Sequence, residues 1–385
     1  MQIKRSNSVF DLLAKPVRKA IVTLGFSEPT LPQTLAFPPI LEGKNVLLIA
    51  PTGTGKTEAV LLPIFSKLVE HKKQDQKGIQ VIYITPLRAL NRDMLKRLTF
   101  WSGQLDITIE IRHGDTEMKI RRKQALKPPQ ILVTTPETLQ AILPGSTMRR
   151  HLSNVQCVII DEVHDLADSK RGAQLTIALE RVVQATGKEF QRIGLSATVG
   201  NPEEVAHYIA GTNRKIKIVQ AILTKNYRYR VEYLLPTEKD YELAAKLETT
   251  AEASARIRRI TELIDSHKST LVFVNSRTIA ELLGHRFDQL DRSDIAVHHG
   301  SLSREERTLS EDNFKNGTLK AIICTSTLEL GIDIGNVDLV IQYMSPRQVS
   351  SLIQRVGRSG HSLERQSEGI IITAFPDDTL ESLAA

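Results

Sequence analysis

A run of small residues and glycines ahead of a lysine and a threonine could bind phosphate. The run consists of Ala50, Pro51, Thr52, Gly53, Thr54, Gly55, Lys56 and Thr57. Two glycines let the backbone curl so that its N–H groups point at phosphate oxygens, and the N-terminus of a following helix adds positive potential. We expect Lys56 to neutralise the β- and γ-phosphates of a nucleotide and the Thr57 hydroxyl to bind Mg²⁺. The alternative is an ordinary glycine-rich turn, and Ala50 stands where the usual pattern has a glycine.

A pair of acidic residues, Asp161 and Glu162, directly follows the apolar run 157–160. A carboxylate at the C-terminal end of a strand faces the edge where open sheets bind ligands. There Asp161 would hold Mg²⁺ and Glu162 would polarise the attacking water. Without the phosphate loop, the same pair is equally typical of a helix start, with the aspartate as N-cap.

The segments that must position these residues alternate between short apolar runs and longer stretches of helical periodicity. Expected strands are 45–50, 80–85, 130–134, 157–160 and 192–195, then 270–274, 295–298, 320–324, 339–343 and 369–373. Expected helices include 56–70, 87–101, 173–185, 252–266, 276–288 and 349–356. Continuous apolar runs favour parallel strands that are covered on both faces, so the fold class is α/β with open parallel sheets. Pro63 predicts a kink in the first helix or its early end.

The strand–helix pattern pauses around 212–239, which predicts a domain boundary there. We place one domain at 1–220 and the other at 221–385, as the length of 385 residues also favours. Lys and Arg total 51 and Asp and Glu total 44, and the net charge of +7 permits a polyanionic partner without proving one.

The two cysteines, Cys157 and Cys324, lie far apart in apolar runs. They suit a reducing intracellular setting and exclude a four-cysteine metal or iron–sulfur site within this chain. We expect a cytoplasmic protein, since we find neither a signal peptide nor an apolar stretch of roughly 20 residues that could span a membrane.

Several further motifs resemble those of superfamily 2 helicases, across nearly the whole chain. Phe26 and Gln33 resemble the motif that reads adenine, in which the ring packs on the base and the amide can donate and accept together. The Ser-Ala-Thr segment 196–198 resembles the motif that couples hydrolysis to domain closure, although alone it is also typical of a strand-end turn. The resemblance implies two RecA-like domains with an ATP cleft between them.

In the second half, 327–333 resembles motif V and 354–361 resembles motif VI of that superfamily. The resemblance places Asp333 and Gln354 at the nucleotide. It also makes Arg358 the arginine finger for the γ-phosphate, a role that can be worth ~10³–10⁵ in rate. Arg355 is the less favoured finger, and is expected instead to tie the motif to its own domain. His361 stands where many relatives have a second arginine, and would donate a hydrogen bond instead of a full charge.

More narrowly, the chain resembles the large helicase-related (Lhr) family of archaea and bacteria. The segments that carry this resemblance are 112–116, 161–167 with 170–172, 298–304 and 355–361. Proteins of that family continue into winged-helix and further modules, so the resemblance implies that this chain is a fragment. It also implies 3′→5′ movement on DNA, with RNA–DNA hybrids as further substrates.

Five loops, each after an expected strand, are predicted to contact a nucleic-acid strand through N–H groups and hydroxyls that bind phosphates. The contacting residues would be Arg88, Thr135, Glu137, Arg277, His299, Gly300, Ser301, Thr325 and Thr327. Each loop alone is also typical of plain turn chemistry, and the five together favour a binding track. The basic runs 121–123, 149–150 and 256–259 are interpreted as solvated helix faces.

Together these patterns predict a monomeric, nucleic-acid-stimulated ATPase of the helicase type. It would use ATP and Mg²⁺, act on single-stranded DNA or RNA and on duplex junctions, and unwind duplex DNA or RNA–DNA hybrids. A DExH RNA helicase and a translocase that does not separate strands share every motif and stay open. A nucleotide-gated binding module without turnover would have lost Lys56, Glu162 or Arg358, and all three are intact.

Overall fold

The computed structural model describes residues 8–51, 53–71, 78–85, 90–197, 199–221, 227–329, 334–359 and 367–384. The chain divides into two compact units, Met1–Leu223 (unit 1) and Thr224–Ala385 (unit 2). Within the described residues, no helix has the length and apolar character to cross a membrane.

Unit 1 is built on a seven-stranded sheet in which every pairing is parallel. The strand order is β3-β4-β2-β5-β6-β1-β7. The strands are β1 (Asn45–Ile49), β2 (Val81–Ile84), β3 (Ile109–Arg112), β4 (Ile131–Thr134), β5 (Cys157–Ile160), β6 (Gln191–Ser196) and β7 (Ile216–Gln220). Because all strands run the same way, their carboxyl ends share one edge of the sheet. The sequence missed the two outer strands, β3 and β7, which are only partly buried and carry charged residues between isoleucines.

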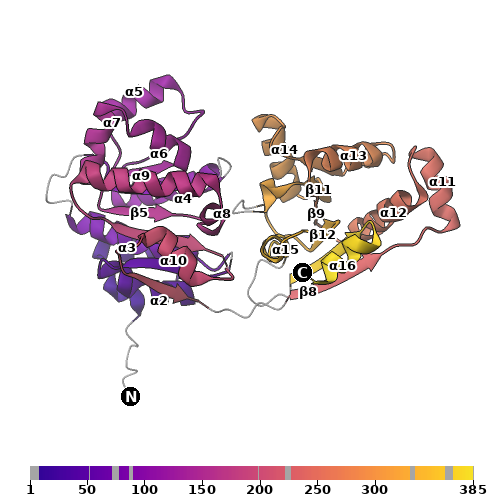
Figure 1. Ribbon diagram of the computed structural model, residues 1–385, viewed down its shortest axis with the longest axis horizontal. Helices are drawn as coiled ribbons and strands as arrows, with labels where there is room; N and C mark the ends of the chain where they lie inside the picture. The colour runs from indigo at the N-terminus through magenta and orange to yellow at the C-terminus, as the bar shows by residue number, and fades with distance from the viewer. Residues whose placement is uncertain are drawn as a thin grey trace, which may run out of the picture. The chain divides into compact units, whose positions relative to one another are not determined.

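Helices flank this sheet (Figure 1). They are α1 (Lys15–Thr23), α2 (Leu31–Leu41), α3 (Lys56–His71), α4 (Leu90–Leu105), α5 (Met118–Leu126), α6 (Pro136–Ile142), α7 (Ser146–His151), α8 (His164–Ala167), α9 (Lys170–Thr186) and α10 (Pro202–Ala210), with 3₁₀ turns η1 (Val9–Leu12) and η3 (Leu152–Asn154). Helix α3 runs through Pro63, so an early end of this helix is wrong.

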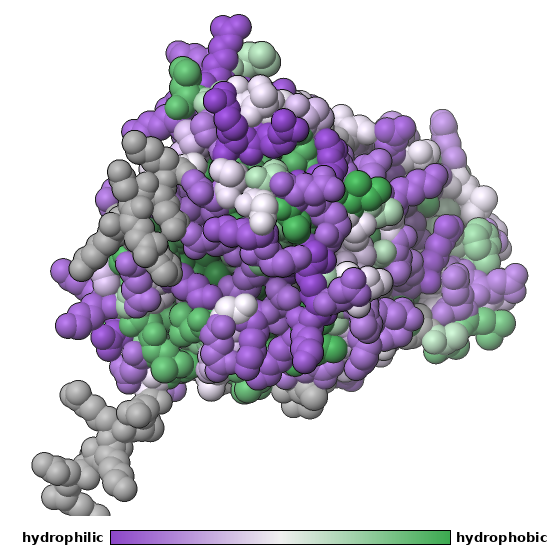
Figure 2. All heavy atoms as spheres, turned by 60° about the vertical axis from the view of Figure 1, so that its left-hand side comes forward, coloured by the Kyte–Doolittle hydropathy of each residue, from purple (hydrophilic) through white to green (hydrophobic). Residues whose placement is uncertain are grey.

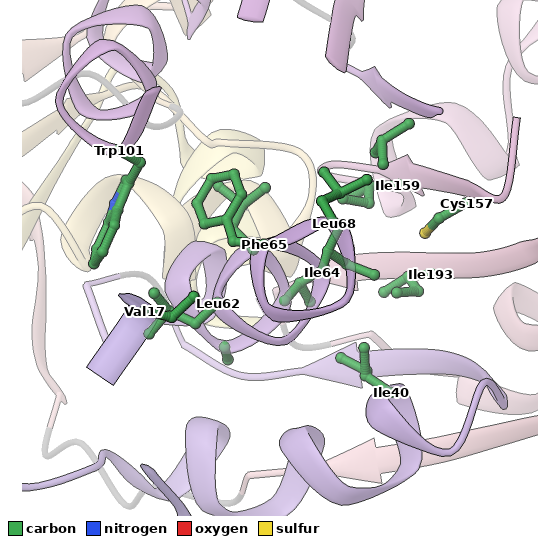
Figure 3. Packing of buried hydrophobic residues seen from close by; sticks show 14 of the residues in the cluster. Val17, Ile40, Leu62, Ile64, Phe65, Leu68, Trp101, Cys157, Ile159 and Ile193 are labelled. Atoms are coloured by element: carbon green, nitrogen blue, oxygen red, sulfur yellow. The ribbon is translucent and has the colours of Figure 1, made fainter. Parts of the chain in front are cut away.

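Successive strand residues of unit 1 enter two different hydrophobic cores, as the alternation of side chains along a strand requires. Tyr83 faces the core formed with α1 to α4, and its neighbours Ile82 and Ile84 face the core formed with α6, α9 and α10. In the first core, the rings of Phe65 and Trp101 lie 5.9 Å apart (Figure 3). The face of the molecule shown in Figure 2 is mostly hydrophilic, and hydrophobic side chains form separate patches on it.

Unit 2 has a six-stranded parallel sheet in the order β10-β11-β9-β12-β13-β8. Its strands are β8 (Tyr227–Tyr233), β9 (Thr270–Phe273), β10 (Ile295–His298), β11 (Ala321–Cys324), β12 (Leu339–Tyr343) and β13 (Ser367–Thr373). Its helices are α11 (Glu238–Lys246), α12 (Ala251–Ser266), α13 (Arg277–Asp288), α14 (Arg304–Lys315), α15 (Val349–Val356) and α16 (Pro376–Ala384), with the 3₁₀ turn η4 (Ser326–Leu328).

Strand β8 corrects the interpretation of 212–239 as a pause between strand–helix patterns. It pairs along its whole length with β13 at the edge of the sheet, and the rings of Tyr227 and Tyr229 stack 5.9 Å apart. Arginines between the tyrosines hid the strand, because an edge strand is half exposed and tolerates charge. The two parallel α/β sheets nevertheless confirm the predicted fold class.

Candidate active site

The phosphate loop joins the carboxyl end of β1 to the start of α3, as predicted. Gly53 and Gly55 adopt φ angles of +77° and +81°, a left-handed backbone that glycine takes without strain. The Thr54 hydroxyl donates to the Pro51 carbonyl oxygen at 2.7 Å and so closes the turn. Thr57 is the second residue of α3, and Thr52 lies outside the described residues.

Lys56 is the charged residue at the end of this loop, where α3 begins. Its side chain is buried, and its Nζ has no hydrogen-bond partner among the described residues. A buried ammonium without a partner is costly, and an anion that supplies oxygen acceptors removes that cost. The loop therefore fits a bound phosphate.

The predicted adenine-reading residues take different positions relative to this loop. A Cβ added to Gly55 would lie 3.1 Å from Gln33 Nε2, so the amide packs directly against the phosphate loop. Gln33 Oε1 also accepts the Thr30 N–H at 3.1 Å and caps α2, a role that sequence analysis missed. Phe26 is 42% exposed, which leaves its ring accessible for stacking.

The acidic pair follows β5 at the same sheet edge. Asp161 Oδ2 accepts the Tyr83 hydroxyl at 2.7 Å, and Oδ1 accepts the Glu162 N–H at 3.0 Å. Burial, and next the charge of Glu162, raise the pKa of Asp161 to about 6, while the Tyr83 hydrogen bond and the charge of Lys56 oppose that shift. The Lys56 charge thus lies within electrostatic reach of Asp161.

Glu162 has a strained backbone, with φ at +44°, in a left-handed region that is uncommon for residues other than glycine. Its Oε2 is buried and has no hydrogen-bond partner among the described residues. Helix α8 starts at His164 with Val163 at the N-cap, so the alternative in which Asp161 caps a helix is wrong. A free carboxylate oxygen is what the activation of water needs.

His164 links the acidic pair to the end of β6. Its Nδ1 lies 3.0 Å from Ser196 Oγ and 3.7 Å from Glu162 Oε2. Burial lowers the pKa of His164, which keeps the imidazole neutral near pH 7. The segments 161–164 and 196–197 are therefore joined by a side-chain contact, and Thr198 lies outside the described residues.

A divalent metal would need oxygens beyond those of the protein here. Among the described residues, no group of three or more His, Cys, Asp or Glu side chains is arranged to hold a metal ion. Mg²⁺ commonly binds through one or two protein ligands together with phosphate oxygens and water. The Asp161 carboxylate and the Thr57 hydroxyl fit that sparse donor set, in which a nucleotide supplies the rest.

Unit 2 holds the two arginines of the segment that resembles motif VI. Arg355 is buried and donates to Gln342 Oε1 at 2.7 Å and to Glu329 Oε2 at 3.3 Å, which confirms that it anchors the segment to its own domain. Arg358 is also buried, and its Nε and Nη2 donate to the Glu329 carbonyl oxygen at 3.1 and 3.0 Å. Gln354 lies in the last turn of α15, and Asp333 and His361 fall outside the described residues.

Thr135 and Glu137, two predicted nucleic-acid contacts of unit 1, follow β4. Thr135 caps α6 by accepting the Thr138 N–H, and the Glu137 carboxylate pairs with Arg171. Both side chains therefore already have partners within unit 1. Arg88 lies outside the described residues. The interpretation of 121–123 as a solvated helix face is wrong for Arg121, which donates to carbonyl oxygens of the loop 113–116.

In unit 2, residues that follow β9 and β11 contact residues at or just after the end of β10. Arg277 Nη1 donates to Ser301 Oγ at 2.9 Å, and His299 is buried with its Nε2 2.5 Å from Glu281 Oε1. The Thr327 hydroxyl lies 2.8 Å from the imidazole of His298. Thr325 occupies the N-cap position of η4 without a capping side-chain hydrogen bond. Gly300 lies in open surroundings, where an added Cβ would approach only Thr327, at 3.9 Å.

The basic run 256–259 is not a solvated face either. Arg258 pairs with the buried Asp240 at 2.8 Å, and Arg259 pairs with Glu232 at 2.8 Å. These arginines hold α12 to α11 and β8, which sequence periodicity alone did not show.

Comparison with known proteins agrees with this geometry. Residues 30–205 match the DEAD/DEAH box helicase family, and residues 254–362 match the helicase conserved C-terminal domain. The chain is 37% identical to the "Lhr helicase/ probable uracil glycosylase" of Mycolicibacterium smegmatis, over 93% of this chain and 26% of that protein. It is 40% identical to the "ATP-dependent helicase Lhr-Core" of Sulfolobus acidocaldarius, over 91% of this chain and 42% of that protein.

Among solved structures, the chain superposes on Mycobacterium smegmatis helicase Lhr bound to ssDNA and AMP-PNP. The TM-score is 0.85 at 37% identity, over 97% of this chain and 49% of that one. It also shares its fold with Mss116p, at a TM-score of 0.79 and 20% identity.

The chain thus carries a DEAD/DEAH box helicase domain in unit 1 and a helicase conserved C-terminal domain that falls in unit 2. Its similarity to Lhr helicases extends over more than nine tenths of the chain. The chain spans less than half the length of the curated relatives described above.

Proposed function

We propose that this chain is the ATP-driven motor of a nucleic-acid helicase that moves along a single strand, 3′→5′ on DNA. The observation that carries the proposal is the buried, unpartnered Nζ of Lys56 in a unit whose sheet edge also holds Asp161 and the unpartnered Glu162 Oε2. A site of this kind binds a triphosphate and presents a carboxylate to water. The Lhr relative whose structure holds ssDNA and AMP-PNP supports the same pairing of ligands.

In this proposal the phosphate loop and Lys56 bind the β- and γ-phosphates, while Gln33 and Phe26 hold the base. Asp161 and Thr57 would hold Mg²⁺, which when bound neutralises charge on the phosphates. Glu162 orients the water and accepts its proton, and the neighbouring His164 connects this segment to Ser196 at the end of β6. Arg358 supplies the positive charge that phosphoryl transfer requires, once it exchanges the Glu329 carbonyl for the terminal phosphate.

Glu162→Gln tests the hydrolytic part of this proposal. The amide preserves the shape of the side chain but cannot accept a proton. We therefore expect binding of a fluorescent ATP analogue within ~2-fold of wild type and turnover lower by ~10²–10⁴-fold. Equal turnover in the variant and the wild type would refute the role of Glu162. Loss of analogue binding would instead mean that the substitution disturbs the loop.

A DNA strand is the favoured track, because the Lhr relative is bound to ssDNA. DExH RNA helicases share the same motifs, so stimulation by matched DNA and RNA oligomers decides between the two tracks. Unwinding, as opposed to movement alone, is tested by release of a labelled strand from a duplex with a 3′ overhang, beside displacement of a triplex strand. We propose that the motor acts as a monomer, which sedimentation at assay concentration checks.

A further inference from the structure

Strand β2 lies between β4 and β5 in the sheet of unit 1. On one side it pairs with β4, which is followed by the predicted nucleic-acid contact Thr135. On the other side it pairs with β5, which is followed by Asp161. At its own end, the Thr85 N–H donates to the Thr134 carbonyl oxygen at 3.0 Å. Any shift of the β4 end is therefore passed to β2 through the backbone.

Tyr83 connects this strand to the acidic pair. Its side chain is fully buried in the core with α3 and α4, where phenylalanine would fill the same volume. A buried hydroxyl is costly without a hydrogen bond, and Tyr83 makes one of 2.7 Å to Asp161 Oδ2. The hydroxyl thus serves the orientation of the carboxylate and adds nothing to the packing of the ring.

Arg97 makes a second connection, from α4 to the phosphate loop. Its guanidinium pairs with Glu58, which is buried in the first turn of α3 and lies two positions after Lys56. Burial, and next the charge of Asp161, raise the pKa of Tyr83, and the charge of Arg97 opposes that shift. The guanidinium of Arg97 therefore lies within electrostatic reach of the Tyr83 phenol, and the two connections end at Asp161 and at the first turn of α3.

We propose that Tyr83 and Arg97 are positioning residues through which nucleic acid bound at the β4 and β2 ends sets the orientation of Asp161 and of the first turn of α3. This inference rests on the proposed function, because it needs an ATPase that nucleic acid stimulates. The two residues touch neither ligand. They act through Asp161 and Glu58, and their removal changes the response to nucleic acid more than the binding of nucleic acid.

The test compares Tyr83→Phe and Arg97→Gln with the wild type in steady-state phosphate release, with and without saturating single-stranded DNA. The readout is the stimulation ratio, the rate with DNA divided by the rate without. We expect each variant to lose about 10-fold of that ratio, as the loss of one hydrogen bond to a charged group allows. DNA affinity, measured by fluorescence anisotropy without nucleotide, stays within about 2-fold of wild type, as expected of residues that contact no phosphate.

Tyr343→Phe is the matched control, because Tyr343 is a buried strand tyrosine of unit 2 whose hydroxyl accepts a hydrogen bond from Arg256 at 3.1 Å. It should keep the wild-type ratio. Arg97 is 43% exposed, so Arg97→Gln should fold even if Tyr83→Phe does not.

The outcomes separate this inference from the proposed function. Wild type without stimulation by DNA or RNA contradicts the function itself. If DNA stimulates the wild type and both variants keep the wild-type stimulation ratio, only the inference about Tyr83 and Arg97 is overturned. Equal loss of basal and stimulated rates in both variants also overturns it, because Tyr83 and Arg97 would then support the ATP site without passing on any signal.

Discussion

Gly172→Ala should disable the motor through a helix contact that leaves no room for a methyl group. Gly172 is the third residue of α9, and an added Cβ would lie 1.8 Å from the Leu166 carbonyl oxygen and 2.9 Å from the Tyr208 hydroxyl oxygen. Leu166 belongs to α8, which starts two residues after Glu162. The sequence motif 170–172 therefore contains a glycine because two backbones meet there.

The magnitude follows from these distances. Ordinary van der Waals contact needs about 3.5 Å, so α8 and α9 must separate by roughly 1.5–2 Å. Overpacking of this kind costs about 1–3 kcal/mol of unfolding free energy. A displacement of about 1 Å in a catalytic group can lower the rate ~10²-fold, so we expect a loss of that order in turnover.

Urea unfolding and stimulated phosphate release measure the two effects. Gly103→Ala in α4 is the control, because nothing lies within 4 Å of an added Cβ there. A helical Gly→Ala change of this type should stabilise by about 0.4–1 kcal/mol and leave turnover intact. A Gly172→Ala protein as stable and active as the wild type would refute the close approach of α8 and α9.

Three further predictions concern single charges. Lys56→Met should abolish nucleotide binding yet raise the unfolding free energy of the nucleotide-free protein by roughly 1 kcal/mol, because a buried ammonium without a partner is removed; calorimetry with and without ATP measures both, and lower stability would contradict the burial argument. Arg358→Ala should keep nucleotide binding and lose ~10³-fold or more in stimulated turnover; a loss below 10-fold would exclude the finger role. Asp240→Asn should cost about 2 kcal/mol at pH 7, because a hydrogen bond from Arg258 holds the pKa of Asp240 at about 2, below the unfolded value of 3.8. This stabilisation is complete above pH 4 and is lost as the pH falls toward 2, so urea unfolding of variant and wild type should converge at acid pH, and a difference that persists there would disprove the linkage.

The sequence predicted the central strands and the phosphate loop because those segments combine continuous apolar runs with glycines whose backbone geometry the function requires. It predicted the edge strands poorly. In β8 the alternating sequence Tyr-Arg-Tyr-Arg belongs to a half-exposed edge strand, but in the sequence alone it resembles a polar linker. Periodicity carries little information where one side of a strand faces solvent.

The missed site residues share another cause. Tyr83 lies inside an apolar run, and the role of its hydroxyl becomes apparent only once the pairing of β2 with β5 brings Asp161 within hydrogen-bond distance. Arg121 and Gly172 are similar, because the loop carbonyls and the Leu166 backbone that define their roles come from other segments. A single sequence shows which side chains can do chemistry. The residues that hold those side chains in place are found only once the segments of the fold are brought together.

Steady-state phosphate release as a function of added single-stranded DNA, with a matched RNA oligomer in parallel, tests directly whether nucleic acid drives this ATPase. We expect a saturable rise of at least about 10-fold with one of the two polymers, because catalytic groups must be aligned before phosphoryl transfer. A rate that stays the same without polymer, with DNA and with RNA would contradict the coupling of ATP hydrolysis to nucleic acid.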